Sequence, residues 1–251
     1  MTKFSYQLYS SRNFGPLEAT LEMLGKDGYA QVEGYGALYA KLEALEALKA
    51  ALKANNLHMA TGHFGLDMVE NDPQRVLDIA KELDIEAVYV PYLMPDDRPS
   101  DSAGWKAFGA RLQAAGAPLR AAGLRFGWHN HDFEFAATPE GDIPLDLILE
   151  GGPDLELELD IAWVQRGGAD PLAYIAKYAD RISAAHVKDI AAPGENTDED
   201  GWADVGHGVM DWAALMGALE QTGAKYFVME HDNPSDDTRF SRRAIASVRS
   251  F

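Results

Sequence analysis

The chain of 251 residues is long enough to bury a large core, because 47% of its residues are hydrophobic. This length is ordinary for a single α/β barrel, so we predict one domain over residues 1–251. The sequence contains no cysteine, which excludes disulfides, thiolate metal sites and a cysteine nucleophile. Any metal ion must therefore be bound by His, Asp and Glu.

The formal net charge of −18 argues against a nucleic-acid partner, because binding a phosphate backbone requires Lys and Arg. No apolar run reaches the roughly 18 residues that a membrane span needs. Residues 1–14 lack the apolar core of a signal peptide. We therefore expect a soluble cytoplasmic protein with no nucleic-acid or membrane partner.

In the first half of the chain, short apolar runs alternate with helical patterns. The clearest helix is Leu38–Ala54, in which leucines recur at helical spacing and form a stripe that we interpret as core. Pro118 is expected to kink the long alanine-rich helix Trp105–Ala122, in which it lies. The predicted strands are Phe4–Leu8, Tyr29–Tyr35, His58–His63 and Ala87–Pro91, and the predicted helices are Pro16–Leu24, Leu38–Ala54, Gln74–Leu83 and Trp105–Ala122.

The second half continues the alternation. Asp72 and Asp170, each followed by proline, are predicted N-caps of helices. Residues 190–210 form the longest predicted loop. The predicted strands are Arg125–Phe135 with its loop, Leu155–Asp160, Ile182–Asp189 and Tyr226–Asp232, and the predicted helices are Pro144–Leu149, one that starts at Asp170, one that starts at Asp211, and Phe240–Ser250.

Eight strands alternating with about eight helices predict a parallel sheet, and the strict alternation favours a closed (β/α)₈ TIM barrel. A doubly wound open sheet is the alternative. Several predicted strands end in clusters of polar residues. Because the active sites of such barrels lie at the carboxyl ends of the strands, these clusters predict one shared site.

The segments RFGWHNHDFEF, LDIAWVQRGGADP, HVKD, VGHGVMDW and VMEHDNP together resemble the xylose-isomerase-like TIM-barrel superfamily. The similarity is greatest to its sugar phosphate isomerase/epimerase branch, which includes inosose dehydratases and tagatose or psicose epimerases. The resemblance covers essentially the whole chain and implies one bound divalent ion. Its implied ligands are Glu134, Asp160, His186 and Glu230, and this donor set suits Mn²⁺, Mg²⁺, Co²⁺ or Zn²⁺.

The assignment of Glu134 is the least direct of these four ligand assignments. Relatives place the strand-five glutamate near the position of Trp128, which cannot bind a metal, and Glu134 has the same strand parity as Trp128. The same argument puts Glu156, Glu158 and Asp160 on one face of their strand. Burying these carboxylates is costly unless they are paired, so we expect Lys188 or an arginine to compensate at least one of Glu156 and Glu158.

Other polar residues at strand ends are expected to contact the substrate, namely His131, Lys188, His63 and Glu33. Core packing or charge compensation is the alternative for each. The roles of His129 and His207 stay open. A homodimer is possible, because barrels of this type often dimerise.

The resemblance implies a metal-dependent isomerase or epimerase of a sugar or keto-sugar. In such enzymes an enediolate is stabilised by the metal, and two carboxylates, here Glu134 and Glu230, transfer the proton next to the carbonyl. A carbon–oxygen lyase, such as an inosose-type dehydratase or a 3-keto-glycoside eliminase, could use the same site. A nuclease requires more metal ligands and a basic groove, and a non-catalytic sugar-binding barrel is the remaining alternative.

Overall fold

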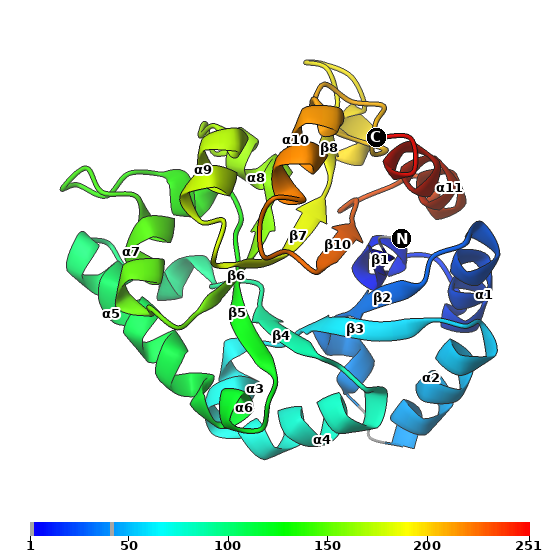
Figure 1. Ribbon diagram of the computed structural model, residues 1–251, viewed down its shortest axis with the longest axis horizontal. Helices are drawn as coiled ribbons and strands as arrows, with labels where there is room; N and C mark the ends of the chain where they lie inside the picture. The colour runs from blue at the N-terminus through cyan, green and yellow to red at the C-terminus, as the bar shows by residue number, and fades with distance from the viewer. Residues whose placement is uncertain (1–2, 41–42) are drawn as a thin grey trace.

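The computed structural model describes residues 3–40 and 43–251 (Figure 1). Within these residues, eight parallel strands close into a barrel in the order β1-β10-β7-β6-β5-β4-β3-β2. The predicted closed barrel is therefore confirmed, and the alternative of an open sheet is wrong. The barrel strands are β1 (Phe4–Gln7), β2 (Gln31–Gly34), β3 (His58–His63), β4 (Ala87–Val90), β5 (Arg125–His129), β6 (Glu156–Asp160), β7 (Ile182–Val187) and β10 (Tyr226–Met229).

Helices surround the barrel (Figure 1). Both predicted aspartate caps are confirmed, since Asp72 accepts a hydrogen bond from the Arg75 N–H and Asp170 accepts one from the Leu172 N–H. The α-helices are α1 (Leu17–Asp27), α2 (Glu43–Ala54), α3 (Leu66–Asn71), α4 (Pro73–Leu83), α5 (Ser102–Ala115), α6 (Ala117–Ala121), α7 (Pro144–Gly151), α8 (Ile161–Arg166), α9 (Pro171–Lys177), α10 (Trp212–Leu219) and α11 (Asp237–Val248). The 3₁₀-helices are η1 (Leu8–Ser11), η2 (Gly36–Tyr39), η3 (Pro95–Asp97), η4 (Phe133–Phe135) and η5 (Thr197–Glu199).

Two predicted helices differ from the structure. The helix predicted over Trp105–Ala122 is two helices, α5 and α6, which meet at Gly116. A Cβ at Gly116 would lie 2.0 Å from Cδ1 of Phe126, so the close approach to β5 requires glycine there. The helix predicted over Leu38–Ala54 begins later, because residues 36–39 belong to η2; residues 41–42 of that prediction lie outside the described residues.

The predicted long loop over residues 190–210 has internal structure. It contains the antiparallel pair β8 (Asp189–Ile190) and β9 (Trp202–Ala203), together with η5. The Asp189 carboxylate accepts backbone hydrogen bonds from Gly206, Gly208 and Met210. These bonds tie the loop to the end of β7, beside the barrel mouth.

The inner and outer faces of the strands carry different side chains. On β6, Leu157 and Leu159 are fully buried in the main apolar core, as the predicted alternation requires. A second apolar cluster, formed by inward-facing residues, fills the lower part of the barrel; it consists of Ala60, Ala87, Tyr89, Ala184, Tyr226 and Val228. His186 and Glu230 lie two residues beyond Ala184 and Val228, so they point into the barrel above this cluster.

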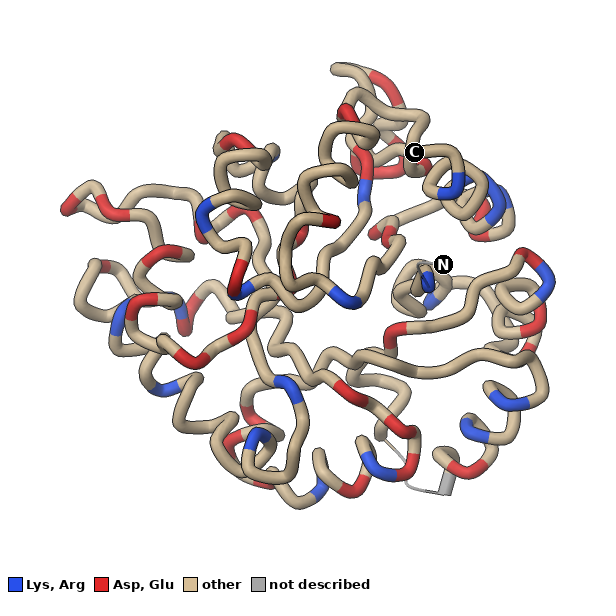
Figure 2. The backbone as a smooth tube through the Cα atoms, in the orientation of Figure 1, with Lys and Arg blue, Asp and Glu red and all other residues tan. Residues whose placement is uncertain are grey.

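Acidic residues are distributed over many elements, with Lys and Arg between them (Figure 2). Some of them pair between helices: Arg111 of α5 donates two hydrogen bonds to the Glu70 carboxylate of α3, at 2.6 and 2.7 Å. Across residues 3–40 and 43–251, no helix has the length and apolar character needed to cross a membrane.

The close packing of α5 against α7 gives a stability prediction. A Cβ at Gly109 of α5 would lie 2.1 Å from the Ile148 carbonyl oxygen of α7, whereas a Cβ at Gly217 of α10 would meet nothing within 4 Å. Gly109→Ala should lower the free energy of unfolding by about 1–3 kcal/mol. Gly217→Ala should raise it by up to about 1 kcal/mol, because alanine is the better helix former. Urea denaturation measures both, and equal effects would contradict the packing.

Candidate active site

Ionisable side chains from six strands converge inside the upper half of the barrel. All of them are at most 8% exposed although they are charged or polar, so each needs partners. They lie in β2, β3, β5, β6 and β7 and directly after β10, and are Glu33, His63, His129, Glu158, Asp160, His186 and Glu230.

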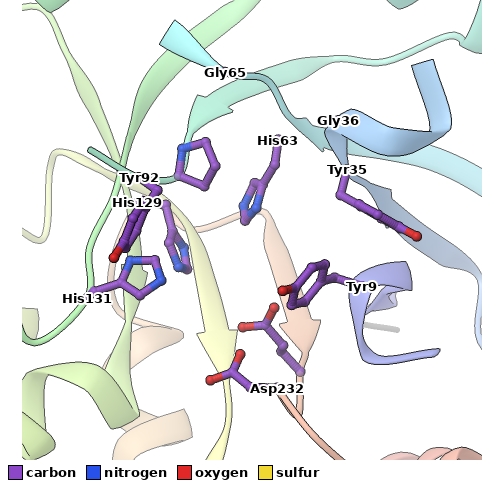
Figure 3. A pocket seen from close by; sticks show the side chains of 11 residues that line it. Tyr9, Tyr35, Gly36, His63, Gly65, Tyr92, His129, His131 and Asp232 are labelled. Carbon is purple, nitrogen blue, oxygen red and sulfur yellow. The ribbon is translucent and has the colours of Figure 1, made fainter. Parts of the chain in front are cut away.

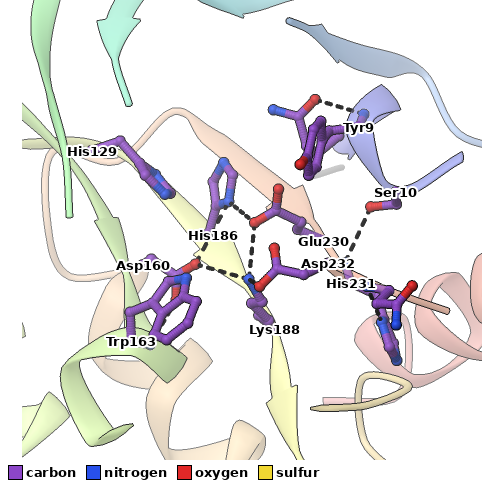
Figure 4. A network of polar contacts seen from close by, with 12 residues as sticks. Tyr9, Ser10, His129, Asp160, Trp163, His186, Lys188, Glu230, His231 and Asp232 are labelled. Atoms are coloured by element: carbon purple, nitrogen blue, oxygen red, sulfur yellow. Dashed lines mark hydrogen bonds and ion pairs between the residues drawn. The ribbon is translucent and has the colours of Figure 1, made fainter. Parts of the chain in front are cut away.

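His186 lies between carboxylates on both sides of its ring, and Figure 4 shows two of them, Asp160 and Glu230. Its Nδ1 is 3.0 Å from Glu230 Oε2 and 3.8 Å from Asp160 Oδ2, and its Nε2 is 2.7 Å from Glu33 Oε1. Burial alone would lower the pKa of His186, but the surrounding carboxylates raise it well above its usual range. One nitrogen of the ring therefore faces the barrel mouth and the other faces a deeper carboxylate.

The deeper polar layer is built around Glu158. Its Oε2 lies 2.6 Å from His63 Nε2 and 3.2 Å from His129 Nδ1. Burial and then the charge of Glu33 raise the pKa of Glu158 to about 8. Burial would also raise the pKa of Glu33, but His63 and His186 lower it to about 2. The layer thus balances two carboxylates against three imidazoles.

Lys188 follows β7 and is fully buried. Its Nζ lies 2.6 Å from Asp232 Oδ2, 3.3 Å from Glu230 Oε2 and 3.9 Å from Asp160 Oδ2. Burial alone would raise the pKa of Glu230. The charges of Lys188 and His186 outweigh this effect and hold the pKa of Glu230 well below its usual range. Lys188 therefore compensates carboxylates at the mouth.

Lys188 pairs with Asp160, Glu230 and Asp232 and not with Glu158, so the two deep carboxylates of β6 have other partners. Glu156 pairs with Arg125, whose Nη1 lies 3.0 Å from Glu156 Oε2. This confirms the prediction that a lysine or arginine compensates at least one of the two carboxylates. Glu158 faces imidazoles instead. His63 forms a hydrogen bond with this carboxylate, and the His129 ring lies beside it.

The structure does not bring Glu134 into the site. It lies in η4, where its Oε1 accepts a hydrogen bond from Trp128 Nε1 at 2.8 Å and its Oε2 accepts one from the His131 N–H at 2.9 Å. Trp128 packs edge-on against Phe108 of α5, on the helix side of β5. Glu134 does share a side with Trp128, but that side faces away from the barrel interior.

His129 occupies the place that was assigned to Glu134. It ends β5, is 2% exposed and faces His63 and His186 inside the barrel. The sequence contained a signal for this, because the apolar residues Phe126 and Trp128 alternate with Gly127 and His129 just as leucines alternate with carboxylates on β6. The apolar positions face the helices, so His129 faces inward.

Two overlapping groups of side chains could hold a metal ion. The deeper group is His63, His129, Glu158 and His186, and the group nearer the mouth is His129, Asp160, His186 and Glu230; in each, the donor atoms lie within 4.8 Å of one another. Asp160 Oδ2 and His129 Nδ1 are buried atoms without a hydrogen-bond partner. A cation would satisfy both, so the donor chemistry fits a divalent ion.

The mouth of the barrel opens into a cavity of about 420 Å³ (Figure 3). Glu230, Asp232, His63 and His129 line it on the barrel side, and His131 lines one wall. Burial, and then Lys188, lower the pKa of His131 to about 3, so its imidazole is neutral. Of the residues expected to contact a substrate, His131 and His63 reach this cavity, whereas Glu33 and Lys188 lie behind its lining.

The chain belongs to the xylose isomerase-like TIM barrel family, whose model matches residues 21–250. This confirms the resemblance seen in the sequence. No curated protein matches the chain by sequence.

Solved structures share the fold at low sequence identity. A sugar phosphate isomerase/epimerase from Parabacteroides distasonis is 20% identical, with a TM-score of 0.83 over 99% of this chain and 94% of that one. The IolI protein, solved with a zinc atom, is 17% identical, with a TM-score of 0.73 over 99% and 96% of the two chains. The 3-keto-D-glucoside 4-epimerase of E. coli is also 17% identical, with a TM-score of 0.73 over the full length of both chains.

Glu134 should give the protein a characteristic pH dependence of stability. Burial raises the pKa of Glu134 from 4.5 to about 8, against the effect of its hydrogen bonds. Folding therefore favours the protonated acid, and this stabilisation is complete below pH 4.5 and lost as the pH rises through 8. Its full value is up to about 5 kcal/mol, since one pKa unit corresponds to about 1.4 kcal/mol.

Glu134→Gln carries no titrating group at this position. Between pH 5 and pH 9, the variant should lose less free energy of unfolding than the wild type, as urea denaturation at each pH would measure. The other buried acids titrate in both proteins and cancel in the difference. Identical pH profiles would contradict the assignment of Glu134 to a buried, non-ligating position.

Proposed function

We propose that the protein is a divalent-metal-dependent isomerase or epimerase of a sugar or keto-sugar. The observation that carries the proposal is the buried group His129, Asp160, His186 and Glu230, which meets the cavity at Glu230 and His129. The family supports it, as do structural neighbours described as sugar phosphate isomerase/epimerases and a 3-keto-D-glucoside 4-epimerase.

The proposed ligands of the ion are His129, Asp160, His186 and Glu230. This set keeps three of the ligands implied by the sequence resemblance and replaces Glu134 with His129. Two imidazoles and two carboxylates suit Mn²⁺, Co²⁺ or Zn²⁺, and Mg²⁺ less well, because Mg²⁺ prefers oxygen ligands. When bound, the ion would stabilise the negative charge that develops on sugar oxygens during proton transfer.

Glu230 is the proposed proton acceptor. Its carboxylate reaches the cavity, and Lys188 and His186 keep it ionised at neutral pH. It would take the proton from the carbon next to the sugar carbonyl. Return of this proton from Glu230 to the neighbouring carbon gives the isomer, whereas the epimer requires a second proton donor on the opposite face of the same carbon. His131, a neutral imidazole on the cavity wall, would hydrogen-bond a sugar hydroxyl.

Glu33 is proposed to position His186. Its Oε1 accepts from His186 Nε2 at 2.7 Å and from Gln7 Nε2 at 2.8 Å, so the carboxylate is itself held in place. A proton fixed on Nε2 leaves Nδ1 free to bind a metal ion. This role replaces the substrate contact expected from the sequence, because Glu33 is fully buried behind His186.

Deuterium exchange tests the proposed function. Protein loaded with Mn²⁺ is incubated in D₂O with a panel of keto-sugars, and NMR follows deuterium next to the carbonyl. The wild type should exchange and bind one ion per chain by mass spectrometry. Glu230→Gln should lower exchange at least about 100-fold, because it removes the base, and should bind the ion more weakly. The matched variant Glu134→Gln should retain both properties.

Equal metal content and exchange in wild type and Glu230→Gln would contradict the proposal, as would a wild type that binds no ion. An unsaturated product absorbing in the ultraviolet would instead identify the carbon–oxygen lyase alternative at the same site.

Glu33→Gln should weaken metal binding roughly tenfold to 100-fold, which is the usual cost of losing such a partner of a ligating histidine. Competition with a chelator measures the dissociation constant without any substrate. Glu86→Gln is the matched control, because Glu86 also accepts a side-chain hydrogen bond, from the Tyr226 hydroxyl, but lies at the other end of the barrel strands. Equal metal affinities in wild type and Glu33→Gln would contradict the proposal that Glu33 positions His186.

A further inference from the structure

The cavity has two zones of different chemistry. Its floor consists of the carboxylates and imidazoles of the candidate active site. Its rim includes three tyrosines, Tyr9, Tyr35 and Tyr92, from the segments that follow β1, β2 and β4. Figure 3 shows Tyr9 and Tyr35 on one side of the cavity and Tyr92 beside His131 on the other. The proposed reaction uses only the floor.

The rim tyrosines are exposed but held in place. Tyr9 and Tyr92 are 38% and 41% exposed, which leaves ring surface available to a ligand. The Arg12 guanidinium lies 3.9 Å from the ring centre of Tyr9, and Tyr35 packs against that ring edge-on. On the other side, Arg98 donates a hydrogen bond to the Tyr92 hydroxyl. These contacts order both sides of the rim before a ligand binds.

The charge of the cavity lining disfavours a strongly anionic ligand. Among the described residues that line it, Glu230 and Asp232 carry negative charge and none is Lys or Arg. The nearby cations are committed to other partners: Lys188 to Asp232, and Arg12 to the Asp232 carbonyl oxygen. A phosphate ester at the rim would therefore lie near carboxylates, with no lysine or arginine in the lining to bind it.

We propose that the rim is a subsite for a second ring, so that the substrate is a neutral glycoside of a keto-sugar, whose ketone is the carbonyl that the proposed reaction requires. This inference rests on the proposed function: the reacting sugar would occupy the floor, and a ring joined to it by a glycosidic bond would lie between Tyr92 and the Tyr9–Tyr35 pair. Aromatic side chains stack on flat rings and on the apolar faces of sugars. The second ring is therefore an aryl group or another sugar, which share a flat apolar face.

The test compares ligands that differ only in the second ring. Calorimetry on wild type loaded with Mn²⁺ measures the affinities of matched methyl and phenyl glycosides of glucose, galactose, mannose and xylose, and of cellobiose and lactose. For at least one sugar, the two-ring ligand should bind roughly two- to tenfold tighter than the methyl glycoside. A preference for phenyl glycosides identifies an aryl group, and a preference for disaccharides identifies a second sugar.

Two variants test whether the rim causes the preference for two-ring ligands. Tyr92→Ala should abolish the advantage of the two-ring ligand, whereas Tyr92→Phe, which keeps the ring and removes only the hydroxyl, should preserve it. Both should bind one ion per chain as the wild type does, because Tyr92 contributes to neither candidate metal group.

The inference is overturned if no two-ring ligand binds tighter than its methyl glycoside, if none of the glycosides binds, or if Tyr92→Ala keeps the wild-type preference. These outcomes are separate from failure of the proposed function, which would appear as loss of metal binding or of deuterium exchange. A protein that exchanges deuterium into keto-sugars without any two-ring preference would refute the subsite alone.

Discussion

The cost of burying ionised side chains inside the barrel is the constraint on which the site depends. Glu33, Glu158, Asp160 and Glu230 all lie in the interior and are at most 5% exposed. A buried carboxylate is strongly destabilising unless opposite charge or hydrogen bonds compensate it. His63, His129, His186 and Lys188 supply much of that compensation, yet Asp160 Oδ2 has no hydrogen-bond partner. This oxygen lies in the group of side chains where a divalent ion is proposed to bind.

Strand β7 and the residues after it provide much of the compensation for these buried carboxylates. His186 faces both carboxylate layers, Lys188 compensates the carboxylates at the mouth, and Asp189 ties the following loop to the strand end. That loop brings Trp202 against the Lys188 ammonium, which lies 4.2 Å from the centre of the ring. The segment HVKD thus combines a proposed ligand, a compensating charge and a loop anchor in four residues.

The sequence predicted the barrel and three of the residues that meet in the mouth group, Asp160, His186 and Glu230, because each follows regular strand alternation up to the strand end. Glu134 does not join them because β5 ends at His129 and the chain then turns into η4. The alternation of inward and outward side chains holds only within a strand. Counting it past the end of β5 therefore could not predict whether the Glu134 side chain points into the barrel. The break at Gly116 and the aromatic rim depend on tertiary packing and on loop paths, which local patterns do not encode.

Anomalous diffraction from crystals grown with Mn²⁺ tests the central claim most directly, because it locates the ion without reference to any substrate. The account predicts one peak enclosed by His129, Asp160, His186 and Glu230, with Glu134 still bonded to Trp128. A peak enclosed by His63 and Glu158 in the deeper layer, or the absence of any peak inside the barrel, would contradict it.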